Sequence, residues 1–292
     1  MSVFPHQLVK GDKIGVIAPS SPLHAKEEIY FQDGLKFLEF QGLEVVLGDN
    51  LKSGDRKQKA ADINNFIQDK NVRAIISLQG GDSVQDCLPY LDYNLVEANP
   101  KIFMGFSDIS VLLNVLFSKA GLVTFHGPDV IWNLSKNRGG IMEKSFSGLF
   151  DNVSLFSDFS SYDVTFLNGH SFEGILIGGN LRCFLKLEKL DLLPSNHKSV
   201  LMIEDVNSTL DEIKDRFLLL KNKGYFKNLS GVMLGYFHNC DQENRQKRIY
   251  SAILDILHEY DLPVAVLKSF GHHRDNVILP IGARVKIVLY HS

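Results

Sequence analysis

The sequence is poor in the features that mark several large classes of protein. It contains three cysteines in 292 residues, and these lie far apart in apolar surroundings, at Cys87, Cys183 and Cys240. An odd, scattered set does not form a disulfide framework and predicts buried free thiols in a reducing compartment. No apolar run approaches the ~20 residues that span a bilayer, and the first residues lack the basic-then-apolar order of a signal peptide. We therefore expect a cytoplasmic protein that does not enter a membrane.

An excess of positive charge is also missing. The chain has 31 Lys and Arg against 34 Asp and Glu, a formal charge of −3 and a pI of about 6.4. No run of basic residues alternates with aromatic residues, as binding to a single-stranded nucleic acid would require. We expect neither nucleic acid nor an anionic membrane surface as a partner.

Strand-like and helical segments alternate about five times in the first half of the chain. This alternation is typical of an α/β fold with an open, mostly parallel sheet. Helical spacing of apolar residues is found over 26–40, 56–68, 84–91 and from about Ile109 onward. The strand-like runs lie at 13–19, 43–48, 72–81, 101–108 and 122–127.

The alternation lapses between about 130 and 170, where Ser, Asn, Asp and Gly accumulate and a linker is expected. Helices are then predicted over about 209–223 and 243–259. We therefore expect two domains, an N-terminal α/β domain over 1–165 and a second, smaller α/β domain over 166–292. The strand-like runs of the second domain lie at 174–179, 199–206, 229–237, 262–271 and 283–291.

Three loops that could bind a ligand follow predicted strands of the first domain. They are Pro19-Ser20-Ser21, Gly80-Gly81-Asp82 and Gly105-Phe106-Ser107-Asp108. In parallel sheets ligands collect at the carboxyl ends of the strands, so these loops are expected along one edge. The glycine pair could bring backbone N–H groups close to a ligand or could be only a tight turn.

Ser107 stands on a predicted strand-to-helix corner, in the sequence KIFMGFSDIS. Two explanations are open at this stage. Ser and Asp commonly cap helix N-termini, which would make the corner structural. Alternatively, Ser107 is a nucleophile held on a tight turn, which would need a base and an acid elsewhere in the chain.

Several histidines could serve as that base. His126 and His238 each end a predicted strand, and His272 and His273 follow another. For the acid, Glu204 ends the apolar run SVLMIEDV, where a carboxylate needs a partner such as a histidine or else caps the next helix. His272, His273 and Asp275 also leave a metal hydrolase open, although no HExxH or CxxC motif supports one.

Several sequence blocks, spread over nearly the whole chain, point to a known family. The serine block and the closing block with GH…N…LPIG are the most specific. In chain order the blocks are GDKIGVIAPSSP, DRKQKAADIN, VRAIISLQGGDS, LPYLDY, KIFMGFSDISVLLN, GLVTFHGP, EGILIGGNL, LMIEDV, LSGVMLGYF and GHHRDNVILPIGARVKI. In these blocks the chain resembles the LD-carboxypeptidase family of serine peptidases, which includes murein LD-carboxypeptidases and microcin C immunity hydrolases.

The resemblance implies a Ser-Glu-His triad in which Ser107 is the nucleophile, His272 the general base and later acid, and Glu204 the residue that orients His272. It implies an oxyanion hole made by the backbone N–H groups of Asp108 and of the turn Gly80-Gly81. The first domain would supply the nucleophile and the second the other two groups, across a cleft. The family also implies a barrel-like second domain, a homodimer, and catalysis without a metal or organic cofactor.

The chain departs from the family where the substrate is expected to bind. Murein-cleaving members carry an Arg before the glycine pair and a Tyr after it, whereas this chain has Gln79 and Asp82, closer to the immunity-hydrolase branch. The segment 182–198 lacks the usual Gly-Thr-Pro, and Asn207-Ser208 stand where a second acid is usual. These departures leave the triad in place and leave the substrate open.

We therefore expect a serine hydrolase that cleaves an amide next to a free carboxylate or a similar small polar group. The substrate is either a murein L,D-tetrapeptide that loses its terminal D-alanine or a peptidyl or aminoacyl nucleotide, which Asp82 favours. Asp82, Ser20 and Trp132 are weak candidates for substrate contacts, and Trp132 could equally be a core residue. The alternative is a non-catalytic α/β protein that binds a ligand in the same cleft.

Overall fold

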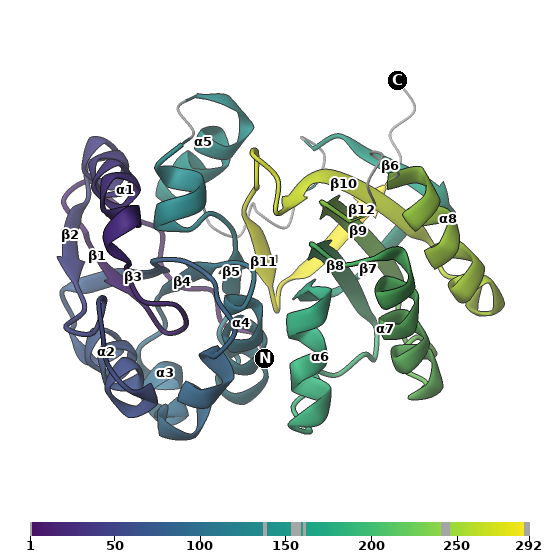
Figure 1. Cartoon of the computed structure of the whole chain (residues 1–292), viewed down its shortest axis with the longest axis horizontal. Helices are drawn as coiled ribbons and strands as arrows, with labels where there is room; N and C mark the ends of the chain where they lie inside the picture. The colour runs from purple at the N-terminus through teal and green to yellow at the C-terminus, as the bar shows by residue number, and fades with distance from the viewer. Residues whose placement is uncertain (1, 137–138, 153–158, 160–161, 241–245, 289–292) are drawn as a thin grey trace. The chain divides into compact units, whose positions relative to one another are not determined.

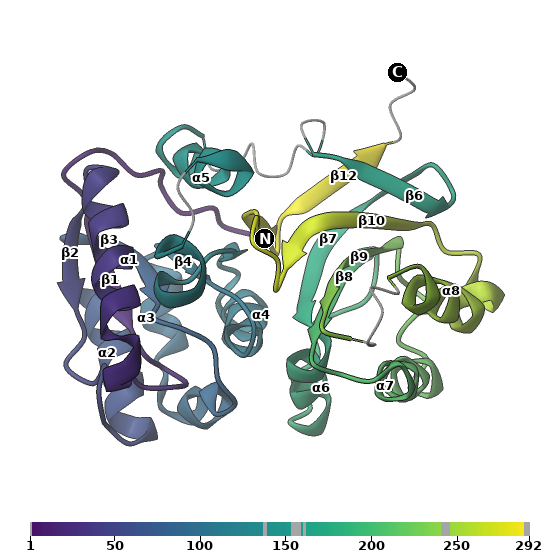
Figure 2. The ribbon, with the colours of Figure 1, turned by 45° about the horizontal axis from the view of Figure 1, so that its top comes forward.

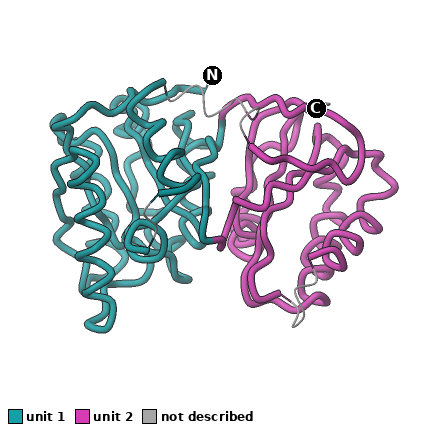
Figure 3. The backbone as a smooth tube through the Cα atoms, turned by 90° about the horizontal axis from the view of Figure 1, so that it is seen from above, with its two compact units in different colours: residues 1–156, 274–282 teal, residues 157–273, 283–292 magenta. Residues whose placement is uncertain are grey.

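The computed structural model describes residues 2–136, 139–152, 159, 162–240 and 246–288. The chain forms two compact units (Figure 3), Met1–Phe156 with Arg274–Gly282 as unit 1 and Ser157–His273 with Ala283–Ser292 as unit 2. The expected domain boundary near 165 stays a prediction. The sequence pattern contains no sign that residues 274–282 belong to unit 1.

Unit 1 is built on a six-stranded sheet with the strand order β11-β5-β4-β3-β1-β2 (Figure 1). Neighbouring strands are parallel except for β11, which pairs antiparallel with β5. Strands β3 and β4 are almost wholly buried, as expected for a parallel sheet covered on both faces. The predicted α/β architecture is confirmed. The strands are β1 (Lys13–Ile17), β2 (Glu44–Leu47), β3 (Val72–Ser77), β4 (Ile102–Gly105), β5 (Thr124–His126) and β11 (Leu279–Ile281).

Helices α1 and α5 lie on one side of this sheet, and α2 and α3 lie on the other (Figure 1). Phe37 of α1 and Phe146 of α5 pack edge to face, with ring centroids 5.2 Å apart. Local signals set the helix ends: the Asp55 carboxylate caps α2, and Gly121 ends α4 with a φ of 67°. The helices are α1 (Glu28–Phe40), α2 (Arg56–Gln68), α3 (Tyr93–Ala98), α4 (Ile109–Ala120) and α5 (Gly140–Ser147).

Unit 2 contains a second six-stranded sheet, with the order β12-β7-β8-β9-β10-β6, which curls into a half-barrel (Figure 2). Strands β7 to β10 are parallel, and β12 and β6 pair antiparallel at the two edges. The predicted barrel-like second sheet is confirmed. The strands are β6 (Val164–Asn168), β7 (Ser171–Asn180), β8 (Ser199–Val206), β9 (Gly231–His238), β10 (Val264–Gly271) and β12 (Arg284–Val288), and the helices are α6 (Leu181–Lys189), α7 (Leu210–Asn222) and α8 (Gln246–Leu257).

The interval from about 130 to 170, predicted as a linker, contains regular structure. It includes a π-helical turn at Val130–Leu134 as well as α5 and β6. Its polar residues are partly caps: the Asp129 carboxylate accepts the N–H of Trp132 at 2.6 Å. Parts of three predicted segments lie outside the described residues, namely 137–138, 153–158 and 160–161 of the linker, 243–245 of a helix and 289–291 of a strand.

The cysteines agree with the expectation from composition. Cys87, Cys183 and Cys240 are buried free thiols, as predicted. Burial raises the pKa of Cys87 to about 11 and that of Cys240 to about 12. Among the described residues, no helix is both long and apolar enough to cross a bilayer.

Candidate active site

Ser107 lies on a tight corner between β4 and α4. Its φ of 60° is in the left-handed region, which costs a residue with a side chain about 1–2 kcal/mol. The corner is tight because position 105 has no side chain: a Cβ on Gly105 would lie 2.4 Å from Ser77 Oγ and 2.8 Å from Ile109 Cγ2. Strain of this kind at a half-exposed serine is typical of a nucleophile elbow.

Asp108, which follows this corner, does not use its carboxylate to cap α4. Instead, Asp108 is fully buried, and its Oδ2 accepts hydrogen bonds from Ser20 Oγ at 2.6 Å and from the N–H of Val84 at 2.9 Å. Ser20 is 1% exposed, and its Oγ also accepts the N–H of Ser83 at 3.2 Å. Ser20, which the sequence suggested as a weak substrate contact, is therefore engaged in the protein interior.

The Gly80-Gly81 turn runs beside the serine corner. A Cβ on Gly80 would lie 2.8 Å from Ser107 Cβ, 3.0 Å from Ser107 Oγ and 3.6 Å from the backbone nitrogen of Asp108. Gly81 has a φ of 151°, and a Cβ there would lie 2.3 Å from Ser20 Oγ. Only glycine allows the backbone to approach the serine so closely. Unit 1 therefore brings the predicted nucleophile and all three predicted oxyanion-hole residues together.

The residues that flank the glycine pair differ in their surroundings. Gln79 is buried, and its side-chain amide donates to the carbonyl of Pro22 at 2.8 Å and to Glu27 Oε2 at 3.1 Å. Asp82 is exposed. Of the two positions that depart from the murein-cleaving pattern, Asp82 is the exposed one.

Trp132 is 55% exposed, so the reading of this indole as a core residue is wrong. The Lys136 ammonium lies 4.0 Å from the centroid of its ring, a cation–π contact. The preceding residue, Ile131, donates its N–H to the carbonyl of Leu78 at 3.1 Å. Trp132 is therefore anchored next to the segment that leads into the Gly80-Gly81 turn, and its role as a substrate contact stays a prediction.

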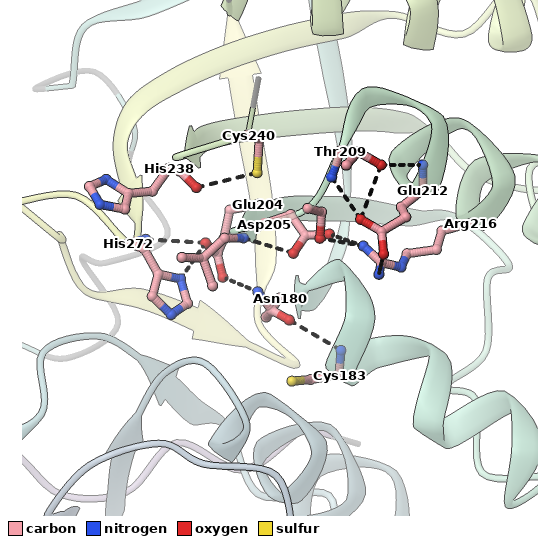
Figure 4. Close-up of polar contacts among 12 residues, drawn as sticks. Asn180, Cys183, Glu204, Asp205, Thr209, Glu212, Arg216, His238, Cys240 and His272 are labelled. Carbon is pink, nitrogen blue, oxygen red and sulfur yellow. Dashed lines mark hydrogen bonds and ion pairs between the residues drawn. The ribbon is translucent and has the colours of Figure 1, made fainter. Parts of the chain in front are cut away.

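Glu204 and His272 form a hydrogen-bonded pair in unit 2 (Figure 4). His272 Nδ1 lies 2.7 Å from Glu204 Oε2, and the backbone N–H of His272 donates to the same oxygen at 3.1 Å. Glu204 is fully buried in β8, whereas His272 directly follows β10. With Nδ1–H directed at the carboxylate, the tautomer that makes Nε2 the proton acceptor is favoured. Helix α7, which Glu204 could have capped, is capped by Thr209 instead.

Two glycines make room for Glu204. A Cβ on Gly271, whose φ is 102°, would lie 2.5 Å from Glu204 Cγ, and one on Gly235 would lie 2.9 Å from Glu204 Cβ. Because Gly271 directly precedes His272, the missing side chain lets the backbone of His272 reach the buried carboxylate.

Asn180 is a further partner of Glu204 that sequence reasoning missed. Its Nδ2 donates to Glu204 Oε1 at 3.0 Å, and its Oδ1 accepts the N–H of Cys183 at the start of α6 (Figure 4). The pairing of β7 with β8 places Asn180 opposite Glu204. The only signal in the sequence is the GGN at 178–180, which directly follows a predicted strand and does not by itself indicate a partner for Glu204.

Asp205 points to the other side of β8 from Glu204, as alternation along a strand requires. Its Oδ2 lies 2.8 Å from Arg216 Nη1, which also donates to Ser208 Oγ at 2.5 Å. Burial raises the pKa of Asp205, and the nearby charge of Glu204 adds to this rise, whereas Arg216 opposes it. This network holds the end of β8 to α7 and does not include His272.

The other candidate bases have different surroundings. His126 is fully buried, with its ring centroid 6.2 Å from that of Phe106. Burial, together with His272 and His273, lowers the pKa of His238. His272 is the candidate base that is hydrogen-bonded to Glu204. Within the part of the chain that the structure describes, no three His, Cys, Asp or Glu side chains gather as ligands for a metal ion.

Known proteins resemble the chain along most of its length. The LD-carboxypeptidase N-terminal domain matches residues 14–127, and the LD-carboxypeptidase C-terminal domain matches residues 173–287. The chain is 31% identical over 291 residues to the probable murein peptide carboxypeptidase of Bacillus subtilis (strain 168), over 96% of this chain and 90% of that protein. It is 27% identical over 314 residues to the microcin C7 self-immunity protein MccF of Escherichia coli, over 96% and 91% of the two chains.

The fold is also similar to solved structures of MccF. The inactive mutant in its apo state superposes with a TM-score of 0.87 at 25% identity, over 98% of each chain. MccF in complex with glutamyl sulfamoyl guanosine superposes with a TM-score of 0.86 at 24% identity, over 98% of each chain, and shares the fold.

Proposed function

Because the chain belongs to the LD-carboxypeptidase family of serine peptidases, we propose that it hydrolyses an amide bond through Ser107, His272 and Glu204. The observation that carries the proposal is the hydrogen bond of 2.7 Å between His272 Nδ1 and Glu204 Oε2. A histidine oriented by a buried carboxylate is the arrangement that activates a serine hydroxyl in hydrolases of this kind. The strained corner at Ser107 supports the assignment of the nucleophile.

The first half of the reaction forms an acyl-enzyme. Ser107 Oγ attacks the carbonyl carbon of the substrate while His272 Nε2 accepts the hydroxyl proton. The imidazolium that results is stabilised by the charge of Glu204. His272 then gives this proton to the leaving nitrogen, the C–N bond breaks, and the acyl group stays on Ser107. In the second half, His272 takes a proton from water, the resulting hydroxide attacks the ester, and Ser107 is released with its proton returned.

The oxyanion formed in each half is proposed to bind backbone N–H groups of unit 1. The candidates are those of Asp108 and of the Gly80-Gly81 turn. Support comes from the close approach of Gly80 to both the serine and the backbone nitrogen of Asp108, at 2.8 Å and 3.6 Å from an ideal Cβ. Donors that are already in place before the reaction stabilise the developing charge without reorganisation.

For the substrate we propose a small peptide or aminoacyl nucleotide with a free carboxylate or similar polar group near the cleaved amide. The relatives' names support both classes, because one is a probable murein peptide carboxypeptidase and the other is an immunity protein whose structure holds glutamyl sulfamoyl guanosine. The exposed carboxylate of Asp82 beside the glycine turn favours the aminoacyl nucleotide. Location in the cytoplasm and a homodimeric state stay predictions.

The test compares wild type, Ser107→Ala and the matched control Ser118→Ala. The control removes an exposed hydroxyl from α4, the helix that follows Ser107. Each protein is given a murein L,D-tetrapeptide and an aminoacyl-sulfamoyl adenosine, with and without EDTA, and products are followed by mass spectrometry. We expect Ser107→Ala to lower kcat by about 10³-fold or more and Ser118→Ala to leave it unchanged.

Each outcome of this test has a definite meaning. The substrate that is cleaved identifies the branch of the family. Turnover that survives Ser107→Ala refutes the nucleophile, and turnover that EDTA abolishes points to the metal hydrolase. If neither substrate is cleaved, binding of both by equilibrium dialysis supports the non-catalytic alternative.

A further inference from the structure

A buried polar network joins the three loops that follow β1, β3 and β4 in unit 1. Its centre is the carboxylate of Asp108, which is fully buried. One oxygen, Oδ2, accepts both Ser20 Oγ, 88 positions away in sequence, and the N–H of Val84. Burying a carboxylate is unfavourable unless it is hydrogen-bonded, so we looked for a function that would explain a buried carboxylate at this position. The proposed reaction uses the backbone N–H of Asp108 and leaves its side chain without a function.

The network holds the segment Gly80–Val84 at both ends. At its start, the carbonyl of Gly80 accepts the N–H of Ser21 at 3.1 Å. At its end, the N–H of Ser83 donates to Ser20 Oγ at 3.2 Å, and the next N–H donates to the Asp108 carboxylate at 2.9 Å. The glycine turn is therefore held at its start by a backbone hydrogen bond and at its end by one hydroxyl and one carboxylate.

We infer that Asp108 and Ser20 are positioning residues, whose hydrogen bond holds the Gly80-Gly81 turn against Ser107. The inference rests on the proposed function, because it concerns the N–H groups that would bind the oxyanion. Such donors act only within about 2.7–3.1 Å of the oxyanion, and a displacement of about 1 Å can lower a rate by about 10²-fold. The turn already lies as close to Ser107 as glycine allows. If the hydrogen bonds at its end are lost, the turn can therefore move only away from Ser107.

Two alanine substitutions remove the attachment from its two sides. Asp108→Ala removes the acceptor of both Ser20 Oγ and the N–H of Val84. Ser20→Ala removes the hydroxyl that donates to Asp108 and accepts the N–H of Ser83, and it leaves the carboxylate in place.

The experiment measures the full-length variants Asp108→Ala and Ser20→Ala. The control is Thr124→Val, which removes another buried hydroxyl of unit 1, bonded to the carbonyl of Leu113 at 3.1 Å. Three readouts are taken: kcat and KM for the substrate that wild type cleaves, the rate of labelling of Ser107 by a fluorophosphonate, and amide hydrogen exchange of residues 80–84.

We expect Asp108→Ala and Ser20→Ala to lower kcat by about 10- to 100-fold with KM within about threefold of wild type. Labelling of Ser107 falls in parallel, and the amides of Ser83 and Val84 exchange faster. Thr124→Val lowers the melting temperature but leaves kcat unchanged.

Other results would overturn the inference. It is wrong if Ser20→Ala keeps the wild-type kcat, or if Thr124→Val loses activity to the same extent. If Asp108→Ala does not fold, the kcat, labelling and exchange rates of Ser20→Ala test the inference. If wild type is neither labelled at Ser107 nor active, the proposed function is refuted instead. Faster amide exchange at Ser83 and Val84 in Ser20→Ala than in wild type would then still support the attachment of the turn, and equal rates would refute it.

Discussion

Glu204→Gln is the substitution that tests the paired carboxylate most directly. It keeps the size of the side chain and replaces one acceptor oxygen by an NH₂ donor. In the native protein both oxygens are acceptors: Oε1 accepts Asn180 Nδ2 at 3.0 Å, and Oε2 accepts the backbone N–H and Nδ1 of His272 at 3.1 and 2.7 Å. The new NH₂ group must therefore face a donor, whichever way the amide turns.

Each orientation of the glutamine has a definite consequence. If its NH₂ faces Asn180, two donors meet, and Asn180 cannot turn over without giving up its bond to the N–H of Cys183. If its NH₂ faces His272, the backbone N–H loses its acceptor, and the imidazole must carry its proton on Nε2, where it cannot act as a base. Because position 204 is fully buried, water does not relieve either conflict.

The expected loss of activity is large and the loss of stability is moderate. A wrong tautomer together with loss of the orienting charge lowers kcat of a serine hydrolase by about 10³- to 10⁴-fold. One unpaired buried donor lowers the free energy of unfolding by about 1–3 kcal/mol. KM is expected to stay within about threefold of wild type, because the proposed reaction gives Glu204 no contact with the substrate.

The assay is steady-state turnover of the substrate that wild type cleaves, with urea denaturation measured in parallel. Asp205→Asn is the matched control, since it neutralises the adjacent buried carboxylate on the other side of β8. Asp205 also uses both oxygens as acceptors, from the N–H of Val206 and from Arg216 Nη1, so the control is expected to lose stability as well. Its kcat is expected to stay unchanged, because neither of these bonds involves His272. Activity of Glu204→Gln within tenfold of wild type, or an equal loss in Asp205→Asn, would refute the reasoning.

Two further predictions concern a glycine and a buried thiol. Gly271→Ala places a Cβ 2.5 Å from Glu204 Cγ, so we expect it to displace His272 from the carboxylate and lower kcat by at least about 10-fold; circular dichroism controls for folding, and wild-type kcat would contradict the prediction. Burial raises the pKa of Cys87 to about 11, so the unfolded thiol ionises first as the pH rises, and this thiol's contribution to the free energy of unfolding should fall by about 2 kcal/mol between about pH 8 and pH 11. Chemical denaturation at several pH values checks this, and Cys87→Ala should flatten the decline; an identical decline in the variant would contradict the assignment.

Elements with strong local signals were predictable from the sequence. Strand β8 and helix α2 are examples, because one is a continuous apolar run and the other begins with an Asp55 cap. The placement of Ser20, Gly80 and Ser107 after parallel strands of one sheet also follows from the alternation of strands and helices.

Elements that depend on a distant partner were missed. Strand β11 has only three residues and includes Pro280, so no periodicity marks it, and it exists because it pairs with β5 at the sheet edge, where proline is tolerated. The same pairing draws 274–282 into unit 1. Strand β6 likewise depends on its antiparallel pairing with β10, which nothing in the composition of the predicted linker indicated.

For the candidate site, residue types and the family resemblance were enough to name Ser107, Glu204 and His272. The bond from Asn180 to Glu204 depends on the register of β7 against β8, which one sequence does not specify. The bond from Ser20 to Asp108 spans 88 positions and forms only because β1 and β4, which flank β3, end at the same edge of the sheet. The sequence by itself therefore determined which groups carry the proposed chemistry, because residue type and local pattern do not depend on the tertiary fold. Only the tertiary structure decided which buried polar groups hold them in place, because those hydrogen bonds join residues that folding alone brings together.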